Sequence, residues 1–380
     1  MLSSQFGLRT FIVFIVHVNA VLGRIGPFAN IPVFSSEFSP DGFSRPMLLA
    51  GGTFPGPLVT GIKGNTFKIN VINRATDAQA IAVQWHGISH QSHTFEYGFA
   101  ADQAGDFSYR PLIVYDPEDP HSSLYDVDDE STVVTLTDHY HADAGALMNS
   151  YLKGATKGNI PTPAGGLING KGRYLNGPAS ELPVINVQPS KRYRFRVINI
   201  GTATPFQFSI DEHKLTVIAV DGTPVRPYTV DRLRIDVGQR YSVVLIANQA
   251  IRNYWTRAVM DTTCFADAST VDPVVKAVLR YEGAPNADPT TTPKAQYDDL
   301  KQHGYKFHVV SEDGKTYNYV DSVIRDTVTV AANGKAVLRF TASHAGVWAF
   351  HAQNEWYRQA GLLAVLMSMP EEIANTSNVL

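Results

Sequence analysis

Hydrophobic and polar residues alternate with a period of two along several short stretches of the chain. Residues 67–71 read Phe-Lys-Ile-Asn-Val, and similar alternation recurs at 192–197, 233–237 and 241–245. Such alternation places one set of side chains on a core face and the other in water, as in a β-strand. Long stretches of helical periodicity do not occur. The pattern predicts an all-β protein built from antiparallel sandwiches.

Turn residues separate these stretches and mark the ends of the expected strands. They occur at Pro40-Asp41-Gly42, Asp221-Gly222, Glu312-Asp313-Gly314 and Asn333-Gly334, and such residues favour tight turns. Residues 283–293 are rich in Pro and Thr, which is typical of a linker. A chain of 380 residues is expected to contain two or three domains.

The composition is ordinary for a globular protein. Hydrophobic residues make up 44% and charged residues 18%, enough for sizeable cores. The formal net charge is -3, without a run of Lys or Arg, which argues against nucleic acid or a membrane surface as a partner. Cys264 is the only cysteine, so an intrachain disulfide is excluded.

Residues 1–23 are typical of a secretory signal peptide. Arg9 supplies a positive charge, residues 10–16 (TFIVFIV) form a short apolar core, and small residues follow up to Gly23. The apolar core is too short to span a bilayer, and the alternative interpretation is a buried strand. The tail, residues 371–380, is polar and does not resemble a lipid-anchor signal. The pattern predicts a secreted, extracellular protein.

Eight segments in order along the chain resemble those of basidiomycete laccases, a family of multicopper oxidases. They are 39–44 (SPDGFS), 53–58 (TFPGPL), 84–87 (QWHG), 101–105 (ADQAG), 124–128 (LYDVD), 167–173 (LINGKGR), 191–196 (KRYRFR) and 346–365. Each segment alone is a weak signal, and their number and order make the resemblance specific.

The resemblance implies tandem cupredoxin-like Greek-key β-sandwiches. Domain 1 is expected at 24–142, domain 2 at 159–283 and an incomplete domain 3 at 294–370. Laccases take single electrons from phenols at a type 1 copper and pass them to a trinuclear copper cluster that reduces dioxygen to water. The expected partners are phenolic small molecules and dioxygen if the chain is active, and the expected assembly is a monomer.

The first two histidine motifs of the family are damaged in this chain. The family's His-Trp-His reads Gln84-Trp85-His86, so that His86 keeps a type 3 position while Gln84 replaces a type 2 ligand. An amide oxygen is a poor replacement for imidazole on copper. The family's His-Ser-His is missing after Tyr109.

The third motif aligns with residues 298–305. His303 keeps a type 3 position, but Asp298 stands at a type 1 position and Lys301 at a type 2 position. An ammonium group cannot bind a metal until it loses a proton.

The fourth motif aligns with residues 348–357. His351 keeps a type 3 position, and Leu362 stands at the axial position. Ala352 replaces the ligand cysteine, Gln353 a type 3 histidine and Tyr357 a type 1 histidine.

Three of ten ligand positions therefore keep histidine: His86, His303 and His351. Copper is the cofactor that the resemblance implies, but a full four-copper loading is not expected, and no catalytic residue is assigned. The first interpretation is that the three histidines keep the positions of the family's ligands but bind no metal. The alternative is weak binding of one copper or zinc ion. Ala203 stands where the family has an acidic residue that contacts the substrate.

His139 and His141 also have the spacing of metal ligands. They lie in a segment, 138–141, that corresponds to a family Asp-Trp-Tyr-His sequence which does not bind copper. A structural or surface role is therefore the first interpretation. Cys264 lies outside every copper motif and is expected to be an inert side chain.

Two classes of function follow. The first is a laccase-type oxidoreductase, impaired in this chain. The second is a non-catalytic secreted cupredoxin scaffold, or the product of a truncated gene model. Missing blocks after residues 88, 109 and 293 are compatible with wrongly removed exons, whereas the substitutions at Ala352 and Tyr357 stand in aligned sequence and favour a diverged paralogue.

The N-terminal pattern generates a prediction about processing. When the full chain is expressed in a fungal host, the secreted protein should begin at a residue between about 21 and 26. Sequencing of its N-terminus is the measurement. Recovery of cytosolic protein that retains Met1 would contradict the prediction.

Overall fold

The computed structural model describes residues 25–76, 96–100, 105–107, 112–294, 307–311, 314–319, 322, 324–330, 333–340 and 346–368. β-Strands dominate these residues, as predicted, and the two α-helices among them are short: α1 (Ala144–Leu152) and α2 (Glu355–Gln359). Three 3-10 turns are η1 (Ser122–Leu124), η2 (Glu130–Thr132) and η3 (Ala268–Thr270). No helix in this part of the chain is long and apolar enough to cross a membrane.

The N-terminal part of the chain forms two small sheets. One has the order β2-β1-β4-β5 and the other the order β3-β7-β6. The strands are β1 (Phe28–Phe38), β2 (Arg45–Ala50), β3 (Val59–Ile62), β4 (Thr66–Asn73), β5 (Glu96–Ala100), β6 (Gly105–Phe107) and β7 (Leu112–Tyr115). Phe67 and Ile69 are fully buried between the sheets with Leu112, while Lys68 is exposed. The alternation predicted for this stretch is confirmed.

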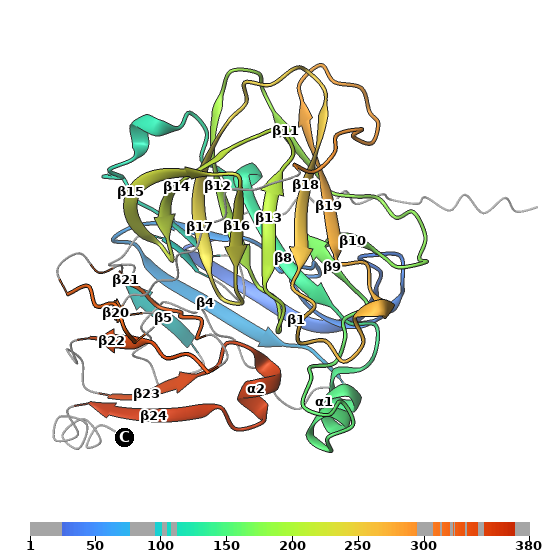
Figure 1. Ribbon diagram of the computed structural model, residues 1–380, viewed down its shortest axis with the longest axis vertical. Coiled ribbons are helices and arrows are strands. Elements are labelled where there is room, and N and C mark those ends of the chain that lie inside the picture. The colour runs from blue at the N-terminus through green and yellow to red at the C-terminus, as the bar shows by residue number, and fades with distance from the viewer. Residues whose placement is uncertain are drawn as a thin grey trace, which may run out of the picture.

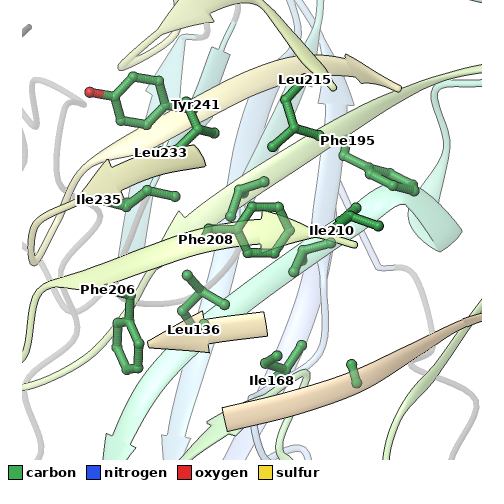
Figure 2. Close-up of a cluster of buried hydrophobic side chains, with 14 of the residues drawn as sticks. Leu136, Ile168, Phe195, Phe206, Phe208, Ile210, Leu215, Leu233, Ile235 and Tyr241 are labelled. Carbon is green, nitrogen blue, oxygen red and sulfur yellow. The ribbon is translucent and has the colours of Figure 1, made fainter. Parts of the chain in front are cut away.

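The middle of the chain forms the largest sandwich. A seven-stranded sheet, β10-β9-β8-β12-β17-β14-β15, faces a five-stranded sheet, β11-β19-β18-β13-β16 (Figure 1). The strands are β8 (Val133–His139), β9 (Gly165–Ile168), β10 (Lys171–Tyr174), β11 (Val184–Val187), β12 (Arg192–Asn199), β13 (Phe206–Ile210), β14 (Leu215–Val220), β15 (Thr223–Val230), β16 (Arg232–Ile235), β17 (Arg240–Ile246), β18 (Asn253–Met260) and β19 (Val274–Tyr281). Figure 2 shows side chains from both sheets, including Phe195, Phe206 and Phe208, in one core.

Strand β8 connects the first two parts of the molecule. It pairs in parallel with β12 and antiparallel with β9, so it belongs to the seven-stranded sheet. Its Val133 packs with Ile113 of β7 and with Leu58, the residue before β3. The proposed first domain, 24–142, includes this strand, and its pairing favours a boundary before Val133.

The expectation that the arginines of 192–197 face water is wrong for Arg194 and Arg196, whereas Arg192 is half-exposed. Arg194 and Arg196 in β12 are buried, because the segment before β8 covers the outer face of the strand. Arg196 forms a two-pronged ion pair with Asp128, with N–O distances of 2.7 and 2.6 Å, and Arg194 pairs with Asp119. A buried charge requires such a partner.

The C-terminal part of the chain contains two small sheets, shown in orange and red in Figure 1. One has the order β21-β20-β22 and the other is the pair β23-β24. The strands are β20 (Phe307–Ser311), β21 (Ile324–Arg325), β22 (Val337–Arg339), β23 (Gly346–His351) and β24 (Leu363–Ser368).

Buried charges join this part to the large sandwich. Arg240 of β17 is fully buried and donates to both carboxylate oxygens of Asp326 at 2.8 Å. Arg325 lies over the ring of Tyr241 and hydrogen-bonds to its hydroxyl. Asp221 lies 3.6 Å from Arg240 and 3.8 Å from Arg325. Two arginines and two aspartates therefore share one desolvated interface.

His213 is a neutral histidine inside the large sandwich. Its Nδ1 donates to the Asp211 carbonyl at 2.8 Å, and its Nε2 accepts from the Tyr281 hydroxyl at 2.7 Å. Burial lowers the pKa of His213, although the Asp211 carbonyl and nearby acidic groups oppose this shift. The folded state therefore disfavours the protonated ring.

This environment generates a prediction about pH. A lowered pKa in the folded state means that the unfolded chain binds the proton more readily, so His213 should weaken folding as pH falls below about 6.5. The free energy of unfolding, measured by denaturant titration, should fall more steeply with acidification in the wild-type protein than in a His213→Gln variant. Equal slopes in both proteins would contradict the prediction.

Candidate functional site

The fourth histidine motif lies in a strand–helix–strand unit formed by β23, α2 and β24. His351, the last residue of β23, is opposite Leu363 of β24, and the Ala352 amide donates to the Leu362 carbonyl at 3.0 Å. Helix α2 therefore projects from the closed end of a hairpin toward the large sandwich (Figure 1).

The loop that receives α2 is fixed by the buried carboxylate of Asp138, near the end of β8. Asp138 accepts from the Thr202 amide at 2.6 Å, the Ala203 amide at 3.0 Å and the Thr204 hydroxyl at 3.0 Å. Burial raises the pKa of Asp138, and these three hydrogen bonds oppose the rise. The carboxylate thus determines the conformation of residues 202–204.

Helix α2 docks on this loop through its first turn. The Glu355 amide donates to the Thr202 carbonyl at 2.9 Å. Asn354 caps the helix by accepting from the Tyr357 amide at 3.3 Å. Trp356 is 3% exposed and donates from Nε1 to the Tyr140 hydroxyl at 3.3 Å. The helix is therefore anchored by an aromatic side chain and by backbone hydrogen bonds.

His351 is half-buried beside the helix. Its Nδ1 donates to the Ala352 carbonyl at 2.8 Å, so a neutral ring carries its lone pair on Nε2, the nitrogen that a metal would use. His86 and His303, the other two predicted positions, lie outside the described residues, as do Gln84, Asp298 and Lys301. Within the described residues, His351 belongs to no group of three potential metal ligands.

The side chains at the other positions of the fourth motif do not fit copper. Ala352 offers only a methyl group. Burial, together with a hydrogen bond to Cys264, raises the pKa of Tyr357 to about 12, so its phenol is neutral at pH 7 and a poor ligand. The Gln353 side chain lies against Gly238, where an added Cβ would be 3.2 Å from its Cδ. A methyl group, a neutral phenol and an amide are not the His2Cys donor set of a type 1 copper site.

The structure also places two further residues of this region. Ala203, which stands where the family has an acidic residue, is 4% exposed in the loop that Asp138 organises. Cys264 lies outside the copper motifs in sequence, yet it is adjacent to Tyr357 in space. Only the tertiary arrangement reveals this contact.

The structure also brings Asp41 to the two histidines of the 138–141 segment. The potential ligand atoms of Asp41, His139 and His141 all lie within 4.8 Å of one another. Sequence reasoning considered the two histidines but missed Asp41, because about 100 residues separate it from them and no local pattern connects the segments.

Comparisons with known proteins agree over most of the chain. Models described as multicopper oxidase match residues 33–111, 130–284 and 302–372. A laccase of Phlebia radiata is 32% identical over 499 aligned positions, covering 94% of this chain and 93% of the relative. Since this chain has 380 residues, the relative carries many residues that have no counterpart here.

Other relatives are more similar over shorter regions. Laccase-4 of Thanatephorus cucumeris is 44% identical over 67% of this chain, and Laccase-3 of Trametes villosa is 39% identical over 75%. The chain covers only 55% and 64% of these two relatives. The crystal structure of laccase from Botrytis aclada superimposes with a TM-score of 0.78 at 22% identity, covering 91% of this chain and 88% of that one. This superposition supports the cupredoxin-type fold.

The Asp138 network generates a prediction about stability. Asp138→Asn turns one acceptor oxygen into a donor that faces backbone amides, so the variant should lose about 2–4 kcal/mol of unfolding free energy. Amide hydrogen exchange should also accelerate at Glu355, which depends on the Thr202 carbonyl.

The matched control is Glu181→Gln, which makes the same chemical change at an exposed ion pair with Lys171. This control should change the unfolding free energy by less than about 1 kcal/mol. Equal stability of the two variants would show that Asp138 does not organise the loop.

Proposed function

Because the chain belongs to the laccase family of the multicopper oxidases, we propose that it is a secreted cupredoxin scaffold that, in this form, does not oxidise phenols with dioxygen. The observation that carries the proposal is the pair Ala352 and Tyr357, where the family has the cysteine and a histidine of its type 1 copper. Secretion is supported by the signal-peptide pattern of residues 1–23.

The phenol oxidase reaction needs an entry point for electrons. A thiolate sulfur gives the type 1 copper its electronic coupling and its colour, and a methyl group at residue 352 provides neither. The neutral phenol of Tyr357, hydrogen-bonded to Cys264, does not replace an imidazole lone pair. Loss of an outer-shell partner alone costs about 10–100-fold in metal affinity or activity, so the loss of the ligands themselves should cost far more.

The trinuclear copper site, where laccases reduce dioxygen, has an independent defect in this chain. Three type 3 positions keep histidine, and the His-Ser-His motif expected after Tyr109 is missing. Repair of the electron entry point would therefore leave the reaction without its second centre. Because both copper centres lack ligands, a single substitution should not restore phenol oxidation.

A second candidate function is that of an active laccase whose coding sequence is longer than the one for these 380 residues. The long alignment with the Phlebia radiata laccase, in which many residues of the relative have no counterpart, favours this candidate. Sequencing of transcripts across residues 88–110 and 290–300 decides it. A transcript that encodes His-Ser-His after Tyr109 would support the oxidase, and transcripts that match the present sequence would support the scaffold.

The proposal makes a direct prediction about activity. Purified protein incubated with copper salts should show no thiolate-to-copper absorption and no copper-dependent oxidation of a phenolic substrate in air. The Ala352→Cys variant should remain inactive, because the ligands of the second centre are still absent.

A laccase that keeps all ten copper ligands is the positive control and should oxidise the same phenol under the same conditions. Copper-dependent turnover by the present chain above that of copper salts without protein would overturn the proposal.

A further inference from the structure

A compact set of ligating side chains lies where the N-terminal sheets meet the large sandwich. Asp41 is in the turn between β1 and β2, His139 ends β8 and His141 follows two residues later. Hydrogen bonds fix the turn to the sandwich: the Ser180 hydroxyl donates to the Asp41 carbonyl at 2.8 Å and the Gly172 amide to the Pro40 carbonyl at 3.2 Å. The three ligands thus come from two rigidly joined elements.

Asp41 and His141 are already oriented toward each other. The Asp41 side chain is 1% exposed, its Oδ1 accepts from the Phe43 amide at 3.1 Å, and its Oδ2 lies 2.7 Å from His141 Nε2. The His141 ring stacks on Phe43 with a centroid distance of 4.0 Å and meets the edge of Tyr174 at 4.6 Å. These contacts fix both side chains before any ion arrives.

His139 supplies the observation that points to a ligand. It is 3% exposed, and its Nε2 is buried without a hydrogen-bond partner among the described residues. An unsatisfied buried polar atom costs about 1–3 kcal/mol, and a metal ion would remove this cost. An imidazole nitrogen that accepts no hydrogen bond can bind a metal ion through its lone pair.

The surroundings of His139 allow a metal ion to approach and limit its affinity for the site. His139 lines a cavity of about 380 Å³ that Tyr140 and Trp356 also border, so an ion and its water molecules can approach this ligand. The Arg45 guanidinium faces the same cluster, and its charge acts on both His139 and Asp41. This positive charge opposes a cation, so binding weaker than that of a structural zinc finger is expected.

We propose that Asp41, His139 and His141 form a binding site for a divalent cation of borderline softness, Zn²⁺ or Cu²⁺. Two imidazoles and one carboxylate are a common protein ligand set for these ions, with water completing the coordination. Bonds of about 2.0–2.1 Å in tetrahedral geometry separate ligand atoms by about 3.3 Å. The ion would take the place of the hydrogen between Asp41 Oδ2 and His141 Nε2, which are 2.7 Å apart. The ligand atoms of all three residues already lie within 4.8 Å of one another, so only small movements of the side chains are needed.

This site differs from the copper positions of the family. The family sequence corresponding to 138–141 has tryptophan where this chain has His139, and that segment does not bind copper in the family. A bound ion would bridge the β1–β2 turn to β8 and so strengthen the junction of the first two parts of the molecule.

The test titrates the full chain, treated with a chelator, with Zn²⁺ by calorimetry and with Co²⁺ by visible absorption. The wild-type protein should bind one ion per chain with an imidazole-type Co²⁺ spectrum, and Zn²⁺ should raise its Tm. His139→Phe and Asp41→Asn should each weaken this binding more than about tenfold.

Two comparisons make the result decisive. His351→Ala removes a histidine of the copper motif and should bind as tightly as wild type, which separates this site from any residual type 3 position. His139→Phe without metal should be at least as stable as wild type, because the unsatisfied nitrogen is gone. Absence of binding up to millimolar Zn²⁺, or unchanged affinity in His139→Phe, would overturn the proposal.

Discussion

The carboxylate of Asp138 is the constraint on which the arrangement of the motif region depends. It is buried near the end of β8 and accepts hydrogen bonds from three consecutive residues, 202–204. Those residues then present the carbonyl groups to which α2 docks. A buried carboxylate is stable only when such donors surround it, so the strand end, the loop and the helix have to adopt their positions together.

The same physical rule joins the parts of the molecule elsewhere. Arg196 with Asp128 closes the outer face of β12, and Arg240 with Asp326 attaches the C-terminal sheets to β17. Removing one partner of such a pair leaves an uncompensated buried charge, which is strongly destabilising. Apolar burial builds each sandwich, whereas paired charges determine how neighbouring parts meet.

Sequence patterns predicted the strands well and their surroundings poorly. Period-two alternation identified the strand at 67–71 and its buried face, because that sheet has one side in water. The same pattern at 192–197 suggested exposed arginines, but β12 is covered on both faces. Alternation shows which side chains of a strand are apolar and which are polar. It does not show whether a segment distant in sequence covers the polar face. Asp41 was missed beside His139 and His141 for the same reason, since no local spacing predicts which turn will meet a strand end.

The metal site proposed in this chain rests on the hydrogen bonding of individual polar atoms, and not on the family motif. At the motif, Tyr357 contacts Cys264 and Ala352 has no donor atom, so His351 is the imidazole that remains there. At the cluster of Asp41, His139 and His141, one buried imidazole nitrogen has no partner among the described residues. An ion binds where it satisfies atoms that folding has left unsatisfied. The family resemblance therefore places the expected copper ligands at the end of β23, whereas the unsatisfied nitrogen at the end of β8 supports the metal site proposed there.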